Sequence, residues 1–98
     1  MNVDKKIARL GFEKIYEDAT RCDYKRFDEK YKYCRNVVLQ KRVAWNEFRL
    51  MSYDTELMDT PYTGNVCSTL TLEEVTVFYR KMKQKTRDYK LLKFIRRV

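Results

Sequence analysis

The residues most able to do chemistry in this chain are the cationic side chains of residues 80–98. This segment has nine Lys or Arg and one acid, Asp88, whereas residues 1–79 have thirteen basic and thirteen acidic residues. The segment therefore carries the whole net charge of +8, and such clusters suit phosphates or carboxylates. The residues that we expect to bind a partner are Arg80, Lys83, Lys85, Arg87, Lys90, Lys93, Phe94, Arg96 and Arg97.

The basic segment also has a plainer interpretation, a solubilising surface. Cations near a helix C-terminus complement the helix dipole, but only within the last turn, which accounts for Arg96 and Arg97. Solvated helix faces usually mix both signs of charge, and this face is nearly all basic. We therefore keep two hypotheses: a polyanionic partner, which is an acidic protein surface, a nucleoprotein complex, DNA or RNA, and a surface that serves solubility.

Aromatic and basic residues interleave in two predicted strands, Tyr24-Lys25-Arg26-Phe27 and Tyr31-Lys32-Tyr33. Sheets that bind single-stranded nucleic acid stack bases on aromatic rings and hold phosphates with cations. This pattern indicates Tyr24, Tyr31 and Tyr33 as base-stacking candidates. The alternative is that these residues are ordinary strand formers.

The composition argues against an enzyme. The chain has no His, which removes the commonest general base, the Ser-His and Cys-His pairs and the usual zinc ligands. The cysteines Cys22, Cys34 and Cys67 form no CxxC pair, and Gly11 and Gly64 are isolated, so no phosphate-cradling glycine loop exists. We expect no catalytic residues, no metal and no cofactor. We also expect free thiols, with a Cys22–Cys34 bridge as the alternative.

The elements that position these residues are predicted to form one α+β domain over residues 1–98. Residues 2–10 show a short helical face that ends at Gly11. A small antiparallel β-meander of about four strands follows, at residues 12–17, 22–27, 31–40 and 44–53. Arg35 and Asn36 interrupt the third strand, and the fourth is alternatively part helical. Residues 54–68 are predicted to be a loop, signalled by Pro61 and Gly64.

A long amphipathic C-terminal helix should pack on this sheet. Thr71-Leu72-Glu73-Glu74 has the pattern of a capping box, which starts a helix. The stripe predicted to face the sheet is Leu72, Val75, Phe78, Tyr79, Met82, Thr86 and Tyr89. Beyond Asp88 the apolar residues leave this stripe. Either the helix ends or bends there and folds back on the domain, or residues 91–98 face a partner, which includes a second copy of the chain.

No apolar run is long enough to span a membrane, and the N-terminus is polar. We therefore expect a cytoplasmic protein that does not engage a membrane. The three cysteines without regular spacing agree with a reducing compartment.

Several short motifs resemble small uncharacterised proteins from phages and prophages of Gram-positive bacteria. The motifs are Leu10-Gly11-Phe12-Glu13-Lys14, Tyr24-Lys25, Leu70-Thr71-Leu72-Glu73-Glu74, Phe78-Tyr79 and Met82, while the basic tail after Gln84 departs from the pattern. The resemblance implies a phage accessory role. Proteins of that kind include anti-CRISPR-like inhibitors of host defence and small nucleic-acid-binding regulators.

Overall fold

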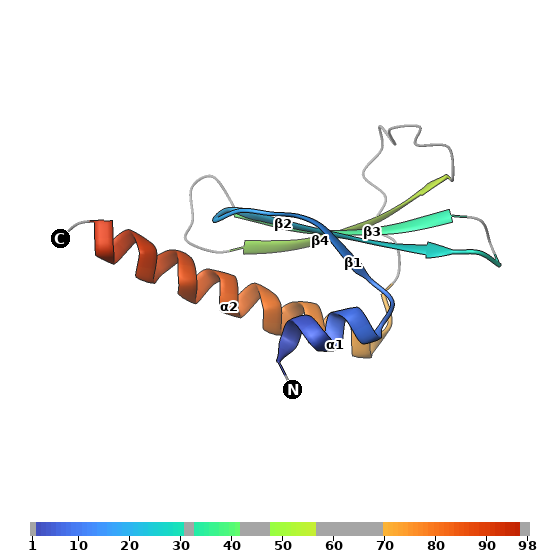
Figure 1. The fold of residues 1–98 in the computed structure, drawn as a ribbon, viewed down its shortest axis with the longest axis horizontal. Helices are drawn as coiled ribbons and strands as arrows, with labels where there is room; N and C mark the ends of the chain where they lie inside the picture. The colour runs from blue at the N-terminus through green and yellow to red at the C-terminus, as the bar shows by residue number, and fades with distance from the viewer. Residues whose placement is uncertain (1, 31–32, 42–47, 57–69, 97–98) are drawn as a thin grey trace.

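Four antiparallel strands and two helices build the predicted α+β fold (Figure 1). The computed structural model describes residues 2–30, 33–41, 48–56 and 70–96, and the side chains of Glu56, Lys93 and Arg96 lie outside that description. The elements are α1 (Val3–Arg9), β1 (Glu13–Glu17), β2 (Arg21–Asp28), β3 (Tyr33–Lys41), β4 (Phe48–Glu56) and α2 (Leu72–Arg96). The strands pair in the order β1-β2-β3-β4, so the sheet is the predicted meander.

The third strand is regular, which corrects the sequence prediction. Arg35 and Asn36 do not interrupt β3, because both keep regular antiparallel pairing with β2 and β4. The Asn36 side-chain amide donates to the carbonyl oxygens of Cys34 at 3.2 Å and Tyr53 at 3.4 Å. Together with a hydrogen bond to the Thr55 hydroxyl at 3.0 Å, these contacts satisfy a buried polar side chain.

The fourth strand also differs from its predicted bounds. Because β4 runs over Phe48–Glu56, residues 48–53 are strand and not helix, and residues 54–56 are strand and not loop. Residues 44–47 of the predicted strand and residues 57–68 of the predicted loop lie outside the described residues.

The core lies between the two helices and the sheet face that they cover. Its buried apolar residues are Ile7, Phe12, Cys22, Tyr24, Val37, Leu39, Val77 and Phe78. Alternate strand residues share a face, so Tyr24 of β2 and its partner Val37 of β3 both point to the helices. Phe78 fills the centre, with its ring centroid 5.0 Å from that of Phe12 and 5.3 Å from that of Tyr24.

Cys22 and Cys34 are both free, buried thiols. Cys22 pairs with Leu39 on the helix-covered face, whereas Cys34 pairs with Phe27 on the opposite face. A bridge between them would have to cross the sheet, so the alternative of a Cys22–Cys34 disulfide is wrong. Burial raises the pKa of Cys22 to about 11, which keeps this thiol protonated at neutral pH. Cys67 lies outside the described residues.

The short helix α1 is capped by Asn2 at its start and is followed by the predicted glycine. The Asn2 side-chain oxygen accepts a hydrogen bond from the Lys5 amide at 2.8 Å, which satisfies a backbone donor of the first turn. The chain leaves the helix through Gly11, whose φ of 91° suits glycine. This turn places α1 beside the first half of α2 (Figure 1).

The capping box predicted at the start of α2 is present. The Glu74 amide donates to the Thr71 hydroxyl at 3.1 Å, and the Thr71 amide donates to the Glu74 carboxylate at 2.8 Å. The other Glu74 oxygen accepts from the Arg26 guanidinium at 2.6 Å. Burial alone would raise the pKa of Glu74, but the hydrogen bonds from Thr71 and Arg26 outweigh it and lower the pKa.

The sheet-facing side of α2 differs from the predicted stripe. Phe78 is fully buried, as predicted, but Leu72, Val75 and Tyr79 are exposed. The buried positions are Glu74, Val77, Phe78, Lys81 and Lys85. The helix is rotated relative to the prediction because three of its charged residues find partners on α1 and the strands, which a periodicity argument cannot anticipate.

Candidate functional site

The cations of α2 divide between two opposite sides of the helix. Lys81 and Lys85 belong to the buried side, which includes Phe78. Arg80, Lys83, Arg87 and Lys90 are exposed and follow one another at three- and four-residue spacing. Because residues three and four apart share a helix face, these four form one row along the solvent side. We call them the outer cation row.

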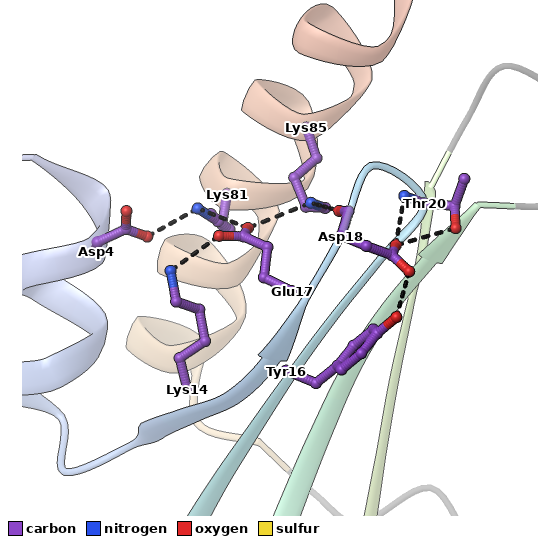
Figure 2. Close-up of polar contacts among 8 residues, drawn as sticks. All are labelled: Asp4, Lys14, Tyr16, Glu17, Asp18, Thr20, Lys81 and Lys85. Atoms are coloured by element: carbon purple, nitrogen blue, oxygen red, sulfur yellow. Dashed lines mark hydrogen bonds and ion pairs between the residues drawn. The ribbon is translucent and has the colours of Figure 1, made fainter.

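Lys81 and Lys85, which we call the inner cations, contribute to a polar cluster around Glu17 at the end of β1 (Figure 2). Lys81 Nζ lies 2.8 Å from Asp4 Oδ1 and 3.3 Å from Glu17 Oε2. Lys85 Nζ lies 3.2 Å from the same Glu17 oxygen and donates to the Asp18 carbonyl at 2.8 Å. The cluster thus joins α2 to α1 and to the β1–β2 turn, both of which are far from α2 in the chain.

The electrostatics of this cluster agree with its geometry. Burial alone would raise the pKa of Glu17, but the hydrogen bond from Lys14 and the charge of Lys81 outweigh it and lower the pKa to about 2. Burial likewise acts to lower the pKa of Lys81, yet its hydrogen bond to Asp4 and the Glu17 charge give a raised pKa. These groups stay charged at neutral pH and satisfy one another.

Lys85 therefore does not serve the role that the sequence predicted for it. Its side chain is 8% exposed and its ammonium group contacts Glu17 and the Asp18 carbonyl, so an external partner cannot reach it in this arrangement. Lys81 was not among the predicted partner-binding residues, and its side chain is also internal, at 6% exposed.

The outer cation row has few internal partners among the described residues. Arg87 pairs with Asp88 at 3.4 Å, but both side chains are exposed, and such pairs contribute little. Lys83 Nζ lies 5.3 Å from the centroid of the Tyr79 ring. No described residue pairs with Arg80 or Lys90. From Arg80 to Lys90 the row extends along about 15 Å of helix, at the usual rise per residue.

An apolar cluster continues α2 beyond the outer cation row. The helix continues past Asp88 to Arg96, so the alternative of a helix that ends near Asp88 and folds back on the domain is wrong. Leu91, Phe94 and Ile95 are 57%, 66% and 59% exposed, and this end of α2 extends past the strands (Figure 1). We call these three residues the apolar end. Phe94 follows Lys90 by one turn and is the predicted partner-binding aromatic.

Three further cations of the predicted partner-binding set lie wholly or partly outside the described residues. The side chains of Lys93 and Arg96 lie outside the description, although both residues belong to α2. Arg97 lies outside the described residues altogether.

Two of the three predicted base-stacking residues, Tyr24 and Tyr33, belong to the described residues. Tyr24 is 2% exposed and packs against Phe78, so the prediction that it stacks on bases is wrong for this arrangement. Tyr33 points to the same face as Tyr24, and its hydroxyl accepts a hydrogen bond from Arg35 at 3.0 Å. Tyr31 lies outside the described residues. On the opposite face of the described sheet the rings of Tyr16 and Phe27 are exposed. Phe27 belongs to the interleaved pattern but was not among the stacking candidates, and Tyr16 lies outside that pattern.

A groove between α1 and the first turns of α2 was also missed by the sequence analysis. It encloses about 660 Å³ and is lined by Lys6, Arg9, Leu10, Leu72, Glu73, Thr76, Val77 and Arg80. Arg80 belongs both to this groove and to the outer cation row. Nothing in the sequence spacing indicates that Lys6 and Arg9 line the same groove as Arg80, because α1 and α2 are far apart in the chain.

The described residues contain no group of three or more Cys, Asp or Glu placed to hold a metal ion. None of their helices is long and apolar enough to cross a membrane.

No protein-family model, curated protein or solved structure matches the chain.

Proposed function

We propose that this protein is a non-catalytic binding protein that docks on an acidic protein surface through the outer cation row and the apolar end. The observation that supports this most is the exposure of both features on one continuous helix. Arg80, Lys83, Arg87 and Lys90 offer positive charge, and the residues that follow them offer exposed apolar area.

The apolar end favours a protein partner over naked nucleic acid. Phosphate backbones are bound by cations, and the contacts that fix a protein on them are largely polar. Exposed Phe94 and Ile95 have no role in such contacts, whereas protein interfaces combine buried aromatic or aliphatic anchors with a charged rim. Burial of one such side chain contributes about 1.5–3 kcal/mol.

The biological setting that we propose follows the resemblance to phage proteins. In that setting the protein is an accessory factor that blocks a host defence or nucleoprotein complex by occupying an acidic surface, as an anti-CRISPR-like inhibitor does. The small size of the fold and the concentration of charge on one exposed helix face support a role as a docking module.

The test compares two variants that each lose two exposed cations. The first, Lys83→Gln with Arg87→Gln, neutralises the centre of the outer cation row. The matched control, Lys5→Gln with Arg49→Gln, removes the same charge from exposed positions elsewhere. We expect the wild type and the control to capture a bacterial protein from lysate. The first variant, which we call the row variant, and Phe94→Ser should fail to capture it. Equal capture by all four proteins would contradict the proposal.

A second candidate function is direct binding of DNA or RNA, and the outer cation row favours it as well. Phosphate contacts of this kind weaken steeply as salt rises and depend little on sequence. Titration of single- and double-stranded DNA and RNA at two salt concentrations decides between the candidates. Tight binding that the row variant loses and Phe94→Ser keeps would support the nucleic-acid candidate and contradict docking on a protein.

A further inference from the structure

The groove between α1 and α2 combines an apolar lining with an excess of positive charge. Leu10, Leu72 and Val77 supply the apolar part, and Leu72 is 83% exposed. Three cations and one acid supply the polar part: Lys6, Arg9, Arg80 and Glu73. Lys6 and Arg9 come from α1 and Arg80 comes from α2, so the cations face the groove from two elements.

The groove lies in line with the outer cation row. Leu72 and Thr76 precede Arg80 by eight and four residues, so they share its side of α2. A ligand that follows the outer cation row toward the start of α2 therefore enters the groove at Arg80. Together the groove, the row and the apolar end extend along most of α2, whose 25 residues span about 37 Å at the usual rise.

We propose that the groove receives an apolar side chain flanked by carboxylates, from an acidic segment of the partner protein. This proposal rests on the proposed function and names the chemistry of the partner at one end of the docking surface. The three cations attract and orient the carboxylates, while the apolar lining removes the intervening side chain from water.

The lining argues against a phosphate backbone as the occupant. A phosphate would use the cations and leave the exposed Leu72 side chain without a contact. A peptide has both kinds of group at alternating positions, so it can satisfy the cations and the apolar lining together.

The test uses two labelled peptides of Glu residues that differ at one central position, Leu in one and Ser in the other. We expect the Leu peptide to bind about tenfold more tightly, because removing a Leu side chain from water increases affinity by about that factor. The Leu72→Ser variant should reduce this preference by about threefold. Ile15→Ser is the matched control, since Ile15 is an exposed aliphatic residue outside the groove, and it should keep the preference.

Methyl NMR spectra then locate the peptide side chain. Shifts of the Leu10 and Val77 methyl signals on adding the Leu peptide support the groove, whereas shifts confined to Leu91 and Ile95 contradict it. Equal affinity for the two peptides, or no binding of either, also contradicts the groove proposal. If Lys83→Gln with Arg87→Gln still weakens binding of the Ser peptide, the proposed function stands without the groove. Tighter binding of a single-stranded DNA oligonucleotide that shifts the same methyl signals would assign the groove to nucleic acid.

Discussion

The inner and outer sides of α2 are both basic, yet their cations have opposite surroundings. Lys81 and Lys85 are buried and reach acidic partners on α1 and β1, whereas Lys83 and Arg87, two residues further along in each case, are exposed. The inner cations hold the helix on the sheet. The outer ones add little to that contact and are available to a partner. Charge density along a sequence therefore does not identify a binding surface until the internal partners of each cation are known.

The largest expected difference between the two sides is the loss of stability when a phenylalanine is replaced by alanine. Phe78→Ala should lower the free energy of unfolding by about 3–5 kcal/mol, because it empties the centre of the core. Phe94→Ala should change it by less than about 0.5 kcal/mol, since that ring is exposed. Urea denaturation followed by circular dichroism measures both values. A large loss in Phe94→Ala would show that the apolar end packs on the protein itself.

The next difference concerns the lysines. Lys81→Gln should lower the free energy of unfolding by about 2–3 kcal/mol, because Asp4 and Glu17 lose the ammonium group between them. Lys83→Gln, two positions away, should change it by less than about 0.5 kcal/mol. The same denaturation experiment compares the two variants. Similar losses in both would contradict the division into inner and outer cations.

Of the two sides of α2, the inner one should determine how the stability of the protein depends on pH. The pKa of Glu17 is lowered from 4.5 to about 2 in the folded protein, so its ion pairs stabilise the fold above pH 4.5 and are lost as the pH falls to about 2. Glu17→Gln should lower the free energy of unfolding by about 1–2 kcal/mol at neutral pH.

Denaturation curves of the wild type and of Glu17→Gln should therefore converge as the pH falls from 4.5 to about 2. A constant difference across that range would show that Glu17 does not act through its charge. The row variant Lys83→Gln with Arg87→Gln provides the control, because its difference from the wild type should not change over the same range.

The smallest effect is expected on the outer side. Lys83→Glu places a carboxylate one turn before Arg87 and interrupts the repulsion within the row. It should raise the free energy of unfolding by about 0.3–0.5 kcal/mol at low salt, and screening should remove the gain at high salt. Thermal unfolding at two salt concentrations measures this change. A loss of stability would indicate that Lys83 makes a contact that stabilises the fold.

The sequence predicted the fold well where the signals are local. The capping box at Thr71 and Glu74, the glycine after α1 and the strand alternation each depend on neighbouring residues. The side of α2 that faces the sheet could not be predicted, because it depends on Asp4, Glu17 and Arg26, which lie far from the helix in the chain. Apolar spacing alone placed Leu72 and Tyr79 inside, where the folded protein has Glu74 and Lys81.

The candidate site was predicted only in part, because some of its features also depend on residues that are distant in the chain. The sequence identified the basic segment and the departure of its apolar residues from the stripe. It could not separate Lys85 from Lys83, because that separation depends on the position of the β1–β2 turn. It also missed the groove, which forms only when α1, from the start of the chain, lies beside α2.

The central position of Phe78 has a consequence for how the chain folds as it leaves the ribosome. All four strands precede α2 in the chain, so during synthesis the sheet face with Tyr24, Val37 and Leu39 emerges before the side chain that covers it. Until Phe78 emerges, that face is open to water and to other chains, a state that favours aggregation. When the basic helix α2 emerges, its side chains cover this sheet face. The same helix adds the net positive charge, through which the folded molecules repel one another.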